Sequence, residues 1–119
     1  MFYRIKDWDK YFEVAQSRPC KKMSWVAVPN RHDGSGYTTV ADHPRKCELF
    51  TAWNLILQVA SKMPTRGVLR KDGKNLTAQE LAKRTRYPKE IFELAFKVLV
   101  EPEIDWLECV DEDRQALDP

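Results

Sequence analysis

The chain has 119 residues, 43% of them hydrophobic, which is enough for one domain that buries roughly 65% of its unfolded surface. Its three cysteines form no Cys-x-x-Cys pair, which excludes a disulfide framework and a zinc knuckle and indicates a reduced, intracellular setting. The formal net charge is only +2, so any attraction to a polyanion must come from an uneven distribution of charge along the chain.

Charged residues near the N-terminus and the short apolar runs argue against export and membrane insertion. Arg4, Lys6 and Asp7 fall where a signal peptide needs an apolar stretch. The longest uncharged run, residues 49–61, is shorter than the roughly 20 residues that span a bilayer. We therefore expect a soluble, cytoplasmic protein.

The first 43 residues predict an N-terminal arm that packs on the rest of the chain. Asp7 is a candidate N-cap for a short helix. The apolar residues of that helix recur on one face from Trp8 to Ala15, and Arg18-Pro19 ends it.

The remainder of the arm predicts a strand and a loop. Residues 24–28, Ser-Trp-Val-Ala-Val, are typical of a short strand, which Pro29 stops. Residues 30–36 contain Asn, Asp, Ser and two glycines and therefore predict a loop.

A long helix is predicted to begin at Pro44 and to run to about Met63, just before Pro64. Its apolar residues cover most of its circumference: Leu49, Phe50, Trp53, Leu55, Ile56, Leu57, Val59 and Ala60. A helix that is apolar nearly all round is buried, so we expect this one to be the central core element.

A capping box marks the start of the next helix. The hydroxyl of Thr77 can accept a hydrogen bond from the backbone N–H of Glu80, whose carboxylate can reach back to the N–H of Thr77. Leu76 and Leu81 occupy the positions of a hydrophobic staple around it. These signals predict a short helix over residues 78–85.

A second short helix follows after only a few residues. Pro88 suits its first turn, where a missing N–H costs nothing, and Pro102 ends it. Two short helices with a brief connection form a helix-turn-helix, which makes DNA the first partner to consider.

Two short strands flank these helices. Residues 67–69 predict a minimal strand before an Asp-Gly turn at 71–74, and residues 104–110 alternate β-forming and charged residues. The order of elements predicts a mainly α fold with a small antiparallel β-sheet: a winged-helix core over residues 44–110, followed by an acidic tail at 111–119. We expect Val68-Leu69 to pair with the strand near Trp106, and the strand at 24–28 to complete the sheet.

Basic residues gather over the turn and the first helix of the motif. Residues 62–89 hold nine basic and two acidic residues, whereas residues 90–119 hold ten acidic and two basic residues. A basic segment that coincides with the motif favours phosphate binding over a solvated loop paired with the acidic tail. The candidate DNA-binding residues are Arg66, Arg70, Lys71, Lys74, Lys83, Arg84, Arg86 and Lys89.

We do not expect the second motif helix to recognise a specific base sequence. The side opposite its core face carries Glu90 and Glu93, which phosphates repel, beside Lys89 and Lys97. We therefore expect weakly sequence-specific contact with the backbone. Phe92, Phe96 and Leu99 form a second apolar strip on this helix. Either another protein covers this strip, which makes Phe92 and Phe96 a candidate interface, or N-terminal aromatic residues do: Trp8, Tyr11, Phe12 and Trp25.

The sequence offers little for catalysis, metals or cofactors. His32-Asp33 lies in a loop that needs Asp and Gly simply to turn. His43 and Cys47 form at most half a zinc site, and a capping histidine beside a buried thiol explains them better. No phosphate-binding Gly-rich loop is present. We expect a protein that is not an enzyme and has no catalytic residues, metal or cofactor.

Several segments resemble the N-terminal module of phage-type replication proteins, the phage replisome organisers and DnaD-like primosomal proteins. They are spread over nearly the whole length of the chain: residues 2–6, 24–30 with 32–34, 53–62, 91–96 and 102–108. The resemblance implies a winged-helix fold and a role in replication initiation or remodelling, in a bacterial host or encoded by a phage. Members of this family usually continue into a further C-terminal region.

Two functions are therefore expected. The first is a DNA-binding winged-helix module of phage or prophage replication that contacts mainly backbone phosphates. The alternative is an interaction module that uses the same fold to self-associate or to recruit a replication protein, without touching DNA. DNA is the expected partner of the first, and a second copy or a replication protein is that of the alternative.

Overall fold

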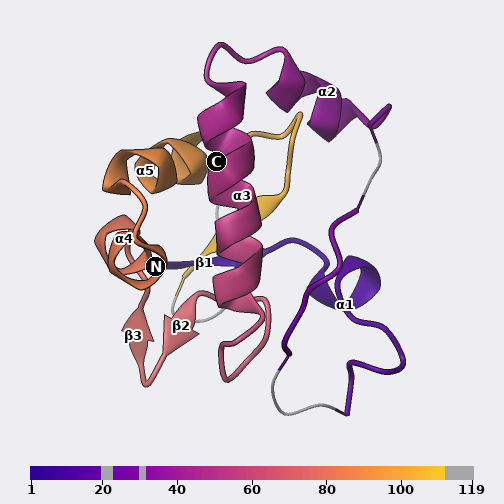
Figure 1. Cartoon of the computed structure of the whole chain (residues 1–119), viewed down its shortest axis with the longest axis vertical. Coiled ribbons are helices and arrows are strands. Elements are labelled where there is room, and N and C mark those ends of the chain that lie inside the picture. Colours follow the sequence, from indigo (N-terminus) through magenta and orange to yellow (C-terminus); the bar gives the residue numbers. More distant parts are fainter. Residues whose placement is uncertain (20–22, 30–31, 112–119) are drawn as a thin grey trace.

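Helix α3 (Lys46–Ala60) is the longest element of the computed structural model, and the other elements pack around it (Figure 1). The structure describes residues 1–19, 23–29 and 32–111. Most of the predicted acidic tail, residues 112–119, lies outside this described part. The chain forms a compact mixed α/β domain, mostly helical, with two small antiparallel two-stranded sheets.

Nine elements follow one another along the described chain. They are β1 (Phe2–Ile5), α1 (Trp8–Tyr11), α2 (Ser35–Ala41), α3 (Lys46–Ala60), β2 (Arg70–Lys71), β3 (Lys74–Asn75), α4 (Ala78–Thr85), α5 (Lys89–Val98) and β4 (Leu107–Val110). In Figure 1, α4 and α5 lie on one side of α3, and α1 and α2 lie on the other.

Helix α3 is the core element that its composition predicts. Seven of its residues are buried: Leu49, Ala52, Trp53, Ile56, Leu57, Val59 and Ala60. It contacts α2, α4, α5 and β1, so its buried surface is shared among four elements. One aromatic ring, that of Phe50, is 41% exposed, so the helix is buried on most of its circumference but not all of it.

Strand β1 joins the two halves of the chain, which the sequence did not lead us to expect. It pairs with β4 from Phe2↔Val110 to Ile5↔Leu107. On its other edge, the backbone N–H of Ile5 donates to the carbonyl of Gly67 at 2.8 Å, and that of Leu69 donates to the carbonyl of Tyr3 at 2.9 Å. The predicted direct pairing of Val68-Leu69 with the strand near Trp106 is therefore wrong, because β1 lies between them.

Four other local predictions need correction. Residues 24–28 form no strand and do not complete a sheet. The first helix ends at Tyr11 rather than at Arg18-Pro19, and Asp7 makes no side-chain cap because it adopts a left-handed conformation with φ 52°. Ser35 and Gly36, predicted as loop, form the first turn of α2. Short segments such as these take their conformation from tertiary contacts more than from propensity.

The first 43 residues contribute to the same core as the rest. Ile5, Trp8, Phe12, Met23 and Val40 are buried in one cluster with the apolar residues of α3, α4 and α5. Trp8 stacks on Phe12 with ring centroids 5.1 Å apart, and Phe12 meets Trp53 of α3 edge-on at 6.1 Å.

Candidate nucleic-acid interface

The β2–β3 hairpin carries the first basic residues of the candidate interface. Its two-residue turn has positive φ at both positions, 54° at Asp72 and 75° at Gly73, as a type I′ turn requires. Lys71 and Lys74 are exposed and face each other across the hairpin. Like charges directly opposite one another destabilise a strand pair, so this arrangement would gain from a bound anion.

Helix α4 carries the next pair of basic residues on its last turn. The Thr77 hydroxyl accepts from the Glu80 N–H at 3.2 Å, which confirms this half of the predicted capping box. The Glu80 carboxylate instead lies 3.5 Å from the Arg84 guanidinium. Lys83 and Arg84 are both exposed, whereas Leu81 of the same helix is fully buried.

The connection between α4 and α5 adds two more exposed basic residues. Arg86 ends α4 in a left-handed conformation with φ 65°, and its N–H donates to the carbonyl of Ala82. Lys89 is the first residue of α5, and its ammonium lies 3.8 Å from the Glu93 carboxylate. Surface pairs at this distance contribute little and leave the lysine accessible to another anion.

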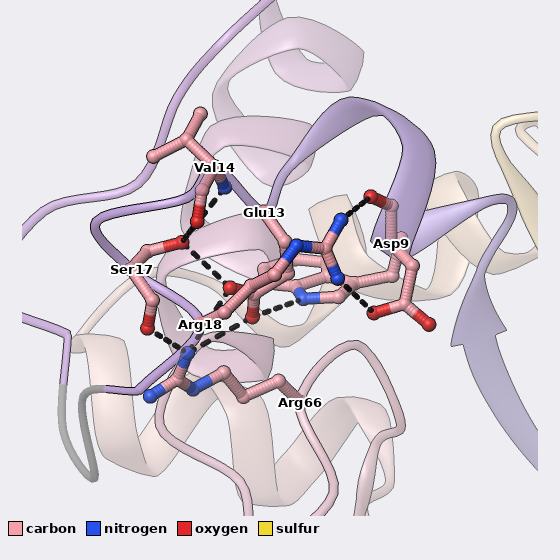
Figure 2. Close-up of polar contacts among 7 residues, drawn as sticks. Asp9, Glu13, Val14, Ser17, Arg18 and Arg66 are labelled. Carbon is pink, nitrogen blue, oxygen red and sulfur yellow. Dashed lines mark hydrogen bonds and ion pairs between the residues drawn. The ribbon is translucent and has the colours of Figure 1, made fainter.

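Two of the predicted DNA-binding arginines are engaged inside the fold. The Arg66 side chain is only 14% exposed and donates to both carboxylate oxygens of Glu13, at 3.0 and 3.1 Å, and to the Ser17 carbonyl at 2.9 Å (Figure 2). The Arg70 guanidinium lies over the Phe2 ring, 5.2 Å from its centroid. Arg66 therefore holds the N-terminal segment rather than facing solvent.

Lys62 adds to the exposed basic residues of the hairpin, of α4 and of the α4–α5 connection, which we call the basic surface. Nothing in the sequence distinguishes Lys62 within the basic segment. It lies after α3, where it lines a shallow hollow of about 430 Å³ together with Arg84 and Thr85 of α4. Contact between α3 and α4, which the sequence does not encode locally, places the two cations at one site.

The exposed side of α5 carries both signs of charge, as predicted. Lys89, Glu90, Glu93 and Lys97 are exposed. Phosphate approach to this face is opposed by its two carboxylates, and few base edges donate to a carboxylate. The helix therefore offers no uniform basic face.

The apolar strip of α5 is covered within the chain, but not by the residues we expected. Phe92 is fully buried, and Phe96 stacks on Tyr3 of β1 with ring centroids 4.1 Å apart and planes 1° apart. Tyr3 of β1 therefore covers Phe96, whereas Trp25, one of the residues expected to cover the strip, is 58% exposed. Phe92 consequently has no surface to offer a partner.

His43 and Cys47 are placed as ordinary structural residues. The ring Nδ1 of His43 accepts from the backbone N–H of Arg45 at 3.0 Å, at the start of α3. Cys47 is exposed rather than buried, which corrects the prediction of a buried thiol there. Among the described residues, no group of three metal-ligating side chains comes together.

In comparisons with known proteins, no protein-family model, curated protein or solved structure matches the chain. In the part of the chain that the structure describes, no helix has the length and apolar character needed to span a bilayer.

Proposed function

We propose that the chain is the DNA-binding winged-helix module of a phage or prophage replication initiation protein and that it binds mainly backbone phosphates. One observation carries the DNA-binding proposal. Five exposed cations on or near α4 have no ion pair with any described carboxylate: Lys62, Lys71, Lys74, Lys83 and Arg86. The role in replication rests on the sequence resemblance alone.

The arrangement of elements supports the winged-helix part of the proposal. Helix α3 is followed by the β2–β3 hairpin, by α4 and α5, and then by β4, which is the order expected of a winged-helix core. Helices α4 and α5 contact each other and both contact α3, as the helices of such a core must. The strand pairing departs from the expected pattern because β1 pairs with β4 on one edge and bridges to Val68 on the other.

Phosphates are the favoured part of the DNA for a chemical reason. Lysine ammonium groups on a hairpin and a helix end can each neutralise a phosphate without reading a base. The glutamates of α5 disfavour close insertion of that helix into a groove lined by phosphates. We therefore expect affinity that depends steeply on salt and weakly on sequence.

The sharpest test reverses the charge of two of these lysines at the interface. The Lys74→Glu/Lys83→Glu variant should bind a labelled DNA duplex at least tenfold more weakly, and the slope of log affinity against log salt should fall by about 0.9 for each phosphate that the variant no longer neutralises. Both lysines are exposed and pair with no described carboxylate, so folding should be unaffected. Fluorescence anisotropy at two salt concentrations measures both quantities.

A matched control separates a local contact from net charge. The Lys10→Glu/Lys46→Glu variant makes the same change in charge at exposed positions on α1 and α3. Its affinity should fall far less than that of the interface variant. Equal decreases in the two variants, or no decrease in the first, would contradict the proposed surface.

The alternative is self-association through the apolar strip of α5, and little of that strip is available to a second copy. Phe92 is buried, and Phe96 is stacked on Tyr3 of its own chain. Sizing by light scattering at high concentration, run beside the DNA titration, tests it directly. A dimer that Phe96→Ala dissociates would favour this alternative.

A further inference from the structure

A cavity on the other side of the molecule is unrelated to the basic surface. It has a volume of about 350 Å³ and lies among α1, the start of α2, α3 and residues 104–106. This volume falls in the range of small-molecule sites. Six aromatic side chains line it: Tyr11, Phe12, Tyr37, Phe50, Trp53 and Trp106.

These rings are held in place by one another and by the backbone. The ring centroids of Trp53 and Trp106 are 5.0 Å apart, and Tyr37 meets Phe50 edge-on at 6.3 Å. Gly36 approaches Trp106 so closely that a Cβ atom there would lie 2.7 Å from the indole Nε1. The aromatic lining is therefore largely preformed, which reduces the entropy that a ligand must overcome on binding.

The charged groups of the cavity favour a cation. Asp7, Asp105 and Lys6 line it. The Lys6 ammonium lies 3.5 Å from the Asp105 carboxylate and 4.0 Å from that of Glu108, so its charge is already compensated. The Asp7 carboxylate has no ion pair with any described residue, which leaves the lining with an excess of negative charge.

Both aspartates adopt an unusual backbone conformation at this cavity. Their φ angles are 52° and 54°, in the left-handed region, which Asp and Asn enter more readily than other residues with a side chain. Two of the four non-glycine residues with positive φ in the described chain thus line one cavity. Backbone strain of this kind is often found at binding sites.

We propose that this cavity binds a small organic cation, with its charged nitrogen near Asp7 and its apolar carbons against the aromatic rings. Aromatic faces attract cations through their quadrupole, and quaternary ammonium groups are recognised this way. Phosphate-bearing ligands are disfavoured because Asp7 and Asp105 would repel them. The proposal does not depend on DNA binding.

The test uses benzyltrimethylammonium chloride as the probe and proton NMR as the readout. Saturable binding should shift the N-methyl protons upfield, because ring currents of the lining act on them, and should shift the indole N–H signal of Trp106. The Asp7→Asn/Asp105→Asn variant keeps residues that tolerate positive φ and should bind the probe about three- to tenfold more weakly. Phe50→Ala, at an exposed wall of the cavity, should reduce the upfield shift.

Two controls make the result decisive. Asp9→Asn removes a charge from α1 at a residue that does not line the cavity, and it should leave the affinity unchanged. Sodium benzoate tests the opposite sign of ligand charge. Tighter binding of benzoate than of the cation, no saturable shift with the cation, or an undiminished affinity in the Asp7→Asn/Asp105→Asn variant would overturn the proposal.

Discussion

At the residue scale, one carboxylate organises the contact between the N-terminal segment and the segment that follows α3. Glu13 accepts hydrogen bonds from the Trp8 indole at 3.0 Å, the Ser17 hydroxyl at 2.6 Å and the Arg66 guanidinium (Figure 2). Burial by itself raises the pKa of this carboxyl, but hydrogen bonds from Ser17, Trp8 and Arg66, with the charge of Arg66, lower the pKa to about 2.

This lowered pKa predicts an acid-sensitive contribution to stability. The free carboxyl has a pKa of 4.5, so the ionised form stabilises the fold at pH values above 4.5. The contribution, on the order of 3 kcal/mol at neutral pH, should disappear as the pH falls from 4.5 towards 2. Urea unfolding of the parent and of Glu13→Gln should therefore differ most at pH 7 and converge at low pH.

An exposed carboxylate provides the comparison. Glu93→Gln removes only a surface pair with Lys89 and should change the urea midpoint little at any pH. A constant difference between the parent and Glu13→Gln from neutral pH down to the pKa of the folded state would contradict the assigned role of ionisation.

At the element scale, two glycines both have positive φ but differ in how closely other residues approach them. Gly67 has φ 87°, and a Cβ atom there would lie 2.7 Å from the Trp8 side chain, at the point where the segment after α3 meets α1. Gly73 has φ 75° in the hairpin turn, and nothing lies within 4 Å of a Cβ atom there. Comparing substitutions at these two positions therefore distinguishes the cost of backbone strain from the cost of a steric clash.

Alanine at each glycine should therefore have unequal effects. Gly73→Ala should cost about 1 kcal/mol, since only the left-handed conformation is strained. Gly67→Ala should cost at least about 2 kcal/mol more, because Trp8 must also move from a well-packed site. Chemical unfolding monitored by circular dichroism measures both. Equal costs would show that the contact at Trp8 relaxes freely.

At the scale of the whole molecule, β1 joins the N-terminal region to the rest of the fold, and we expect the two to unfold as a single cooperative unit. It lies between β4 and residues 67–69, and its Phe2 and Ile5 are each only 3% exposed. An arm merely resting on a separate core would melt separately. Strand β1 should instead unfold together with α3, α4 and α5.

Cooperativity can be measured with two probes. Tryptophan fluorescence reports on Trp8 of α1, Trp25, Trp53 of α3 and Trp106, and far-ultraviolet circular dichroism reports on all helices. Their thermal transitions should therefore coincide. Ile5→Ala should lower both midpoints together, at a cost of about 2–5 kcal/mol for a buried isoleucine. An early fluorescence transition that leaves the helical signal intact would indicate an independent arm.

Local sequence signals determined the elements whose information lies within a few residues. The cap at Thr77, the Asp-Gly hairpin turn and the apolar circumference of α3 each predicted their structure, because capping, turn geometry and burial act over one or two turns. The basic composition of residues 62–89 likewise located the exposed lysines around α4.

Only the tertiary structure decided what depends on distant contacts. Strand β1 lies between β4 and residues 67–69 because hydrogen bonds to both satisfy its two edges, and no local pattern encodes those partners. Arg66 lies 53 positions from Glu13, so its engagement inside the fold could not be inferred from charge alone. The aromatic cavity likewise joins residues from Lys6 to Trp106, which share no sequence motif and meet only when the chain folds.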